Sequence, residues 1–218
     1  MTTNLVKNEA DKVYVVDDDA DVGHSIAVTL SSVGYAVEKY ASAAEFLDHA
    51  SASGPCVAIV DMMLPGMTGL NLCREITLRR MPCSFMVISG HADVPSTVEA
   101  MRIGAIDLLE KPFSRQRMLE IVNKAVKVAQ LNHERRIEED EATRQLEALS
   151  PRERVVFDAI ASGLITKEIS KYLGISPRTV DVHRSRILQK LEIDSPSRLA
   201  KFLAIHERKA FLSLMATG

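Results

Sequence analysis

Short apolar, β-rich runs alternate with segments of helical spacing through the first 113 residues, and the pattern occurs five times. The expected strands are Val13 to Val16, Ala36 to Lys39, Val57 to Val60, Phe85 to Ile88 and Ala105 to Leu109. Their continuous apolar character is typical of parallel strands that are buried on both faces. Alternation of strand and helix therefore predicts a doubly wound α/β (βα)5 domain, with helices on both faces of one parallel sheet.

A long helix is expected after the last strand, because residues 114–149 contain neither proline nor glycine. Its first half carries an apolar stripe that would dock onto the sheet, whereas residues 133–145 are charged on every face and predict a solvated connector. The expected organisation is a first domain at 1–130, a helical linker at 131–147 and a second domain at 148–218.

Helix-start signals dominate the second domain. Ser150, Ser176 and Ser195 each precede a proline, the pattern of an N-cap with proline at the first helical position, and Thr166 is a further candidate cap. A tight turn at residues 173–176 joins the middle two helices. This predicts an all-α, four-helix domain that contains a helix-turn-helix.

The two halves of the chain carry opposite charge. Residues 1–150 contain 15 Lys and Arg against 22 Asp and Glu, whereas residues 151–218 contain 12 against 7. A basic helix-turn-helix module suggests a polyanionic partner. No apolar run approaches the roughly 20 residues that cross a bilayer, so we expect a cytoplasmic protein without a membrane partner. The three cysteines, which lack CxxC spacing, are expected to be small buried apolar residues.

Acidic residues follow two of the expected strands. Asp17 and Asp18 follow the first strand, and Asp61 follows the third. In the flavodoxin-like strand order the ligand crevice falls between these two strands, so the carboxylates are expected to converge. Converging carboxylates repel unless a cation lies among them, and an all-oxygen set suits Mg²⁺. Ser89 and Lys111 stand at the ends of the fourth and fifth strands and would join this site.

These motifs make residues 11–130 resemble the receiver domain of two-component response regulators, with a FixJ-like subfamily nearest. The resemblance rests on VVDDD at 15–19, on the D-x-x-x-P-x-x-x-G spacing that begins at Asp61, on VISGH at 87–91 and on KPF at 111–113. It implies that Asp61 accepts a phosphoryl group from a sensor histidine kinase. Nucleophilic attack by a carboxylate requires positive charge beside the incoming phosphoryl oxygens.

The resemblance also implies roles for the neighbouring residues. Asp18 and Asp61 would bind Mg²⁺ directly, Asp17 through water, and the Met63 carbonyl would complete the protein ligands. Ser89 would hydrogen-bond the phosphoryl group, and Lys111 would pair with its charge and precede a cis peptide bond. One position departs from the family: Leu108 stands where an aromatic usually swings inward, so an aromatic switch is not expected. The implied dimerisation surface contains Glu99, Arg102 and Asp107.

The second domain resembles the NarL/LuxR/FixJ-type helix-turn-helix over residues 148–211. Val180, Ile187, Leu188 and Leu191 recur at a spacing of three to four residues and would bury one face of its third helix. The candidate DNA-contacting residues are Thr166, Lys167, Arg178, Thr179, Asp181, Val182, Ser185, Arg186 and Lys190. Asp181 is the exception among basic and neutral groups, and it suits an amino donor such as cytosine N4.

The sequence thus predicts a transcriptional regulator that is phosphorylated at Asp61, dimerises and binds double-stranded promoter DNA, and is not an enzyme. One alternative is a DNA-binding protein with a vestigial receiver that works without phosphorylation. Another is an Asp-nucleophile phosphatase of the haloacid dehalogenase kind. That class places its nucleophile at the first strand and a second Asp two residues later. Here Asp61 follows the third strand and the residue two positions later is Met63, which argues against this alternative.

Overall fold

The structure is a computed structural model that describes residues 12–50 and 54–216, with side chains as far as Glu207. It divides into two units, residues 1–134 and 135–218, and helix α5 (Arg115–Glu147) contributes to both. The outermost residues of both predicted domains, 1–11 and 217–218, lie outside the described ranges. The domain boundaries predicted at 130 and 148 stay predictions.

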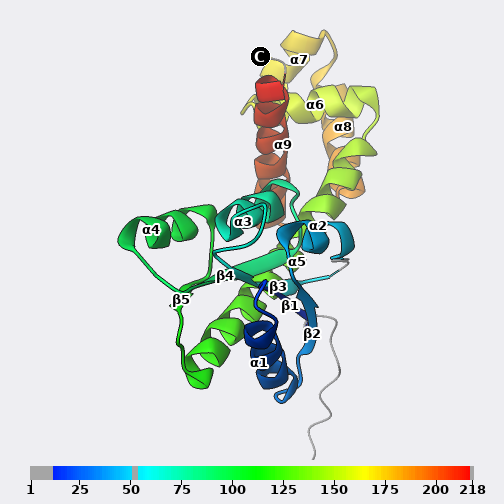
Figure 1. The fold of residues 1–218 in the computed structure, drawn as a ribbon. Helices are drawn as coiled ribbons and strands as arrows, with labels where there is room; N and C mark the ends of the chain where they lie inside the picture. The colour runs from blue at the N-terminus through cyan, green and yellow to red at the C-terminus, as the bar shows by residue number, and fades with distance from the viewer. Residues whose placement is uncertain (1–11, 51–53, 217–218) are drawn as a thin grey trace, which may run out of the picture. The chain divides into compact units, whose positions relative to one another are not determined.

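The first unit is built on five parallel strands in the order β2-β1-β3-β4-β5 (Figure 1). The strands are β1 (Lys12–Val16), β2 (Ala36–Tyr40), β3 (Cys56–Asp61), β4 (Cys83–Ser89) and β5 (Leu108–Glu110). Val16 pairs with Val60 in the β1–β3 register, so the residues that follow these strands emerge side by side. The order is flavodoxin-like and confirms the predicted fold class.

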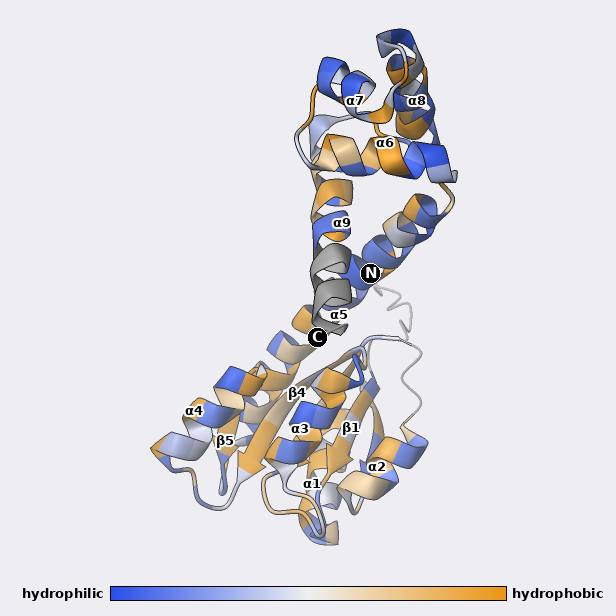
Figure 2. Cartoon of the chain, turned by 90° about the horizontal axis from the view of Figure 1, so that it is seen from above, coloured by the Kyte–Doolittle hydropathy of each residue, from blue (hydrophilic) through white to orange (hydrophobic). Residues whose placement is uncertain are grey.

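Helices cover both faces of the sheet, as predicted. On one face, α1 (Ala20–Ser31) and the first half of α5 pack against the strands. On the other lie α2 (Ala43–His49), α3 (Gly69–Leu78) and α4 (Val94–Ile103). The labelled central strands β1 and β4 are predominantly hydrophobic in Figure 2 because both of their faces are buried. Burying one large aliphatic side chain contributes about 1.5 to 3 kcal/mol, so these strands anchor the core.

Strand β5 begins at Leu108, three residues later than the predicted start at Ala105. The Ala105 N–H donates to the carbonyl of Ala100 in the last turn of α4, and Gly104 between them has a φ of 104°. Asp107 turns its side chain back to accept from the N–H of Leu108. Only the Ala105 N–H serves the end of α4. The Ile106 N–H already donates to the Phe85 carbonyl of β4, and the Asp107 carbonyl accepts from the Val87 N–H, so backbone bonds to β4 begin just before the strand itself.

The second unit contains the four predicted helices after α5. They are α6 (Pro151–Ala161), α7 (Thr166–Leu173), α8 (Pro177–Lys190) and α9 (Pro196–Ala216). Ser150 and Glu153 form a capping box, and Gly174 adopts a left-handed φ of 65° in the turn between α7 and α8. Thr166 is not a cap: it is the first helical residue, and the Glu168 carboxylate accepts from the N–H of the true N-cap, Ile165.

The end of α5 belongs to the core of the second unit. Ala142 and Leu146 are buried there against Phe157 of α6 and Phe202 of α9. The prediction of a connector that is solvated on every face is therefore wrong for this part of the helix. Its two apolar residues, four apart, share one face, and the surrounding charges masked that short stripe in the sequence.

The cysteines behave largely as predicted. All three are free thiols; Cys56 and Cys73 are buried, and Cys83 is partly buried. Within the part of the chain that the structure describes, every helix is too short or too polar to cross a lipid bilayer.

Gly69 couples the fold to the site, because a Cβ at this position would overlap the backbone carbonyl oxygen of Asp61. We predict that Gly69→Ala lowers the free energy of unfolding of the first unit by about 1 to 3 kcal/mol. In the matched variant Gly23→Ala, the new methyl group meets only the Lys39 side chain at 3.9 Å. That variant should be neutral or stabilising by up to about 1 kcal/mol. Urea unfolding compares the two, and equal stability of Gly69→Ala and wild type would contradict the prediction.

Candidate functional site

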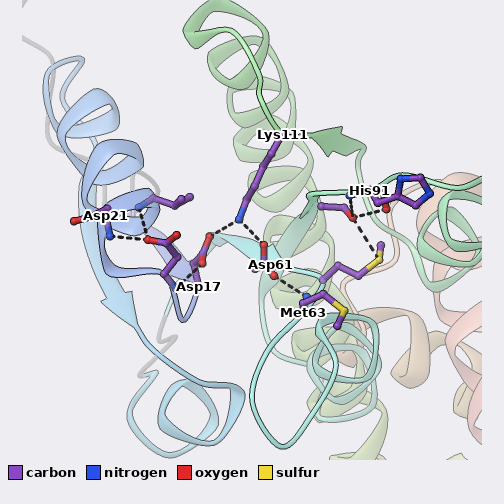
Figure 3. Close-up of polar contacts among 10 residues, drawn as sticks. Asp17, Asp21, Asp61, Met63, His91 and Lys111 are labelled. Atoms are coloured by element: carbon purple, nitrogen blue, oxygen red, sulfur yellow. Dashed lines mark hydrogen bonds and ion pairs between the residues drawn. The ribbon is translucent and has the colours of Figure 1, made fainter.

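Three charged side chains meet at the carboxyl edge of the sheet (Figure 3). Lys111 Nζ lies 2.6 Å from Asp61 Oδ1 and 2.9 Å from Asp17 Oδ2. Both carboxylates are buried, with side chains only 8% and 1% exposed, whereas Lys111 reaches them from the surface. The predicted convergence of the ends of β1, β3 and β5 is thus present in the structure.

Burial and ion pairing set the electrostatics of this cluster. Burial raises the pKa of Asp17, although its hydrogen bond from Lys111 acts in the opposite direction. Burial by itself would lower the pKa of Lys111, but the hydrogen bonds to Asp61 and Asp17 outweigh it and raise that pKa. The lysine is therefore held in its charged form between the two carboxylates. One ammonium group against two carboxylates leaves room for further positive charge.

Backbone hydrogen bonds hold the participating loops together. The Lys111 N–H donates to the Ser89 carbonyl at 2.7 Å, which joins the ends of β4 and β5. The Met62 N–H donates to the Ile88 carbonyl, and the Met63 N–H donates to Asp61 Oδ2 at 2.6 Å. The Lys111–Pro112 peptide bond is cis, as expected.

The predicted metal ligands are only partly assembled. Asp17 and Asp61 lie on either side of Lys111, whereas Asp18 is exposed and the Met63 side chain is 74% exposed. No set of three acidic, histidine or cysteine side chains within residues 12–50 and 54–216 is arranged to hold a metal ion. The donors nevertheless fit Mg²⁺, which takes oxygen ligands, keeps several waters and needs only one or two carboxylates.

Ser89 is buried at the end of β4, but its hydroxyl is occupied elsewhere. It donates to the His91 carbonyl at 2.7 Å and accepts from the His91 N–H at 3.1 Å. Its oxygen also lies 3.7 Å from the Met62 sulfur. Among its hydrogen bonds to residues that the structure describes, the Ser89 hydroxyl therefore makes none to Asp61. The sequence analysis did not predict these partners. A hydrogen bond between a side chain and the backbone two residues later leaves no recognisable pattern in the sequence.

Leu108, at the position of the family's aromatic, is partly buried and packs against the core on the α2–α4 face of the sheet. Met62 packs against the same core.

Two of the three predicted dimer residues are engaged within the unit. Glu99 pairs with Arg74 of α3, and Asp107 pairs with Arg117 of α5 at 2.7 Å. Arg102 is exposed and makes no ion pair with any residue that the structure describes. The surface of α4 also exposes an apolar row that the sequence reading missed, formed by Val94, Val98 and Met101. Residues four and three positions apart lie on one face of a helix, so this spacing could have predicted the row from the sequence.

The predicted DNA-contacting residues cluster on α7 and α8 of the second unit. The exposed ones are Lys167, Arg178, Thr179, Asp181, Val182, Ser185, Arg186 and Lys190, and Thr166 is partly exposed. Val180 and Ile187 are buried beneath them, and Leu191 is buried just past the end of α8. Leu188 is 40% exposed, so its predicted burial is wrong. It lies at the rim of the core, where the helix face turns outward.

Lys190 also has a partner within the second unit. Its Nζ lies 2.7 Å from Glu153 Oε2, which also accepts from the Ser150 N–H. Glu153 is 4% exposed, and the hydrogen bond from Lys190 is the main cause that lowers its pKa to about 2. The capping box was predicted from the sequence. The ion pair of its Glu153 with Lys190 was not, because the two residues are 37 positions apart in the chain. Here Lys190 fastens the end of α8 to the start of α6.

Family models match both parts of the chain. The response regulator receiver domain matches residues 13–123, and the luxR family of bacterial regulatory proteins matches residues 147–203. The transcriptional regulatory protein FixJ of Bradyrhizobium diazoefficiens is 33% identical over 87% of this chain and 92% of its own length. FixJ of Azorhizobium caulinodans is 37% identical over 87% and 90%.

Solved structures show the same architecture. The response regulator StyR matches with a TM-score of 0.70 at 34% identity, covering 90% of this chain and 98% of its own. Full-length FixJ from B. japonicum matches with a TM-score of 0.53 at 33% identity, covering 89% and 96%.

The Glu153–Lys190 pair predicts a pH-dependent stability. Because folding lowers the pKa of Glu153 from 4.5 to about 2, the pair stabilises the second unit fully above pH 4.5. That stabilisation is lost as the pH falls toward 2. Wild type should lose about 1 kcal/mol of this contribution between pH 7 and pH 4, and Glu153→Gln should lose none of it. Urea unfolding followed by NMR signals of the second unit measures both.

The control is Glu192→Gln, which removes a carboxylate paired with Arg198 at the surface. It should keep the wild-type response to pH. If Glu153→Gln keeps that response as well, the pair does not contribute in this way.

Proposed function

This chain is a response regulator of the FixJ type, a phosphorylation-regulated transcription factor, and on that premise we propose that Asp61 accepts the phosphoryl group from a sensor histidine kinase. The observation that carries the assignment is the buried Asp61 carboxylate, 2.6 Å from Lys111 Nζ at the carboxyl end of β3. A nucleophile needs exposure to its donor and positive charge nearby. Asp61 has the charge, and it lies at the carboxyl edge of the sheet, two residues before the exposed Met63.

In the proposed transfer, an Asp61 oxygen attacks the phosphorus of the phosphohistidine, and the P–N bond breaks as the P–O bond forms. Lys111 then exchanges its contact with Asp61 for a phosphoryl oxygen and offsets the added negative charge. Met63 steadies the carboxylate through the hydrogen bond from its N–H. Ser89 gives up its hydrogen bond to the His91 carbonyl and donates to the phosphoryl group instead.

Receivers of this kind use Mg²⁺, and the residues that would hold it here are Asp17, Asp18, Asp61 and the Met63 carbonyl. When bound, the cation supplies charge neutralisation at the phosphoryl oxygens. Asp17 supports this role because it is a second buried carboxylate near Asp61. Two negative charges close together attract a divalent cation.

The proposed output is DNA binding by a homodimer rather than catalytic turnover. The α4–β5 surface lies beside Ser89, which changes partners in the proposed transfer, and it exposes Arg102 and an apolar row. A two-fold dimer there would present two helix-turn-helix units to paired promoter half-sites. Lys167 and Arg178 would contact phosphates, and Arg186, Ser185 and Val182 would face the groove. Such a protein works in the cytoplasm, where the promoter is.

The phosphoacceptor is tested by Asp61→Asn. The amide keeps the shape of the side chain but lacks the nucleophile, so uptake of acid-labile phosphate from acetyl phosphate should be lost. Mass spectrometry of the intact protein measures this. Asp48→Asn, on the exposed side of α2, should incorporate phosphate like wild type. Undiminished incorporation into Asp61→Asn would overturn the assignment, and a phosphate found on Asp18 would relocate it.

The dimer surface is tested by Arg102→Glu. The reversed charge would face an identical reversed charge or the neighbouring Glu99 across the two-fold axis, and like charges at an interface are costly. Dimerisation of the phosphorylated protein should weaken by about tenfold or more, whereas phosphorylation of Asp61 continues. Sedimentation with beryllofluoride and Mg²⁺ measures the association, and Lys124→Glu on α5 is the charge-matched control. Wild-type dimerisation of Arg102→Glu would move the interface elsewhere.

A further inference from the structure

We infer that Asp181 selects a cytosine in the DNA target by accepting a hydrogen bond from its exocyclic N4 amino group. The inference rests on the proposed promoter binding and adds one base preference to it. Asp181 is the only acidic residue in α8, whose other charged residues include Arg178, Arg184, Arg186 and Lys190. A carboxylate placed in such a helix opposes binding to phosphates, so its presence there needs a compensating contact.

The placement of Asp181 on α8 suits a base contact. α8 is the second helix of the helix-turn-helix, and residues near the start of such a helix reach base edges in the major groove. Asp181 is the fifth residue of α8 and is exposed, as are Val182 and Ser185 beside it. Val180 and Ile187, which are buried, face the opposite way and hold the helix on its support.

A hydrogen bond orients the carboxylate. The hydroxyl of Thr166, at the start of α7, donates to Asp181 Oδ1 at 3.3 Å. Asp181 Oδ2 has no hydrogen-bond or ion-pair partner among the side chains described through Glu207. One oxygen is thus used to fix the side chain between the two helices, and the other is left as an acceptor without a donor.

The hydrogen-bonding groups in the major groove then indicate which base the Asp181 carboxylate can contact. A carboxylate only accepts hydrogen bonds at neutral pH, so it requires a donor. Guanine and thymine present acceptors at their own major-groove edges, and adenine presents its N6 donor beside the N7 acceptor. Cytosine presents the N4 donor without such an acceptor, and it therefore suits an isolated carboxylate oxygen best.

The same hydrogen bond admits a purely structural role, in which Asp181 braces α7 against α8. Asp181→Asn separates the two roles. The asparagine Oδ1 still accepts from Thr166, so a brace survives, but the side chain loses its charge and gains an amino group that repels N4. A structural role leaves base preference unchanged.

The test selects binding sites from a random DNA library with the full chain in beryllofluoride and Mg²⁺, for wild type, Asp181→Asn and the control Glu192→Gln. Affinities are then measured for the selected site and its single-base variants at one salt concentration. Wild type and Glu192→Gln should disfavour replacement of one cytosine by about 5- to 100-fold. Asp181→Asn should lose that discrimination at this position and keep the preferences at the others. Thermal unfolding checks that all three proteins are folded.

Other outcomes overturn the inference in distinguishable ways. A uniform gain in affinity for every sequence in Asp181→Asn would show that the carboxylate acts only by repelling phosphates. Unchanged preferences in a folded Asp181→Asn would assign Asp181 to the brace. Failure of wild type to bind any sequence in the library would overturn the proposed promoter binding and the inference together.

Discussion

Lys111 held between two buried carboxylates is the interaction on which the first unit's function depends. Asp17 and Asp61 are brought together by the pairing of β1 with β3, and without a positive charge their proximity would be unfavourable in a buried setting. Lys111 comes from the end of β5, at the far edge of the sheet. A single ammonium group therefore connects three strand ends. In the proposed transfer, a phosphoryl group that draws Lys111 away would affect all three.

That connection extends toward the surface of the unit through the backbone. The Lys111 N–H is bonded to the Ser89 carbonyl, and the Ser89 hydroxyl is bonded to the backbone of His91 in the loop before α4. Under the proposed function, a movement of Lys111 or Ser89 toward a phosphoryl group would act through these bonds on the loop that carries α4. Leu108 stands in place of the family's aromatic, so this proposed path would rest on the hydrogen-bonded loop.

In the second unit, too, one buried charged group holds several elements together. Glu153 caps α6 and holds Lys190, so one buried carboxylate positions two helices. Thr166 ties α7 to Asp181 of α8. The first contact joins the helix-turn-helix to α6, and the second joins its own two helices. Arg178, Ser185 and Arg186 remain on the exposed face. Lys190, predicted as a DNA contact, also has this structural task.

The sequence by itself determined the order of strands and helices, the two units and the meeting of Asp17, Asp61 and Lys111. These follow from periodicity and from the rule that parallel strands end at one edge, so residue spacing is sufficient to predict them. Tertiary structure alone decided that Ser89 faces His91, that Lys190 pairs with Glu153 and that the end of α5 enters the second core. Those contacts depend on side-chain directions and on packing between distant segments, and neither is encoded in local spacing.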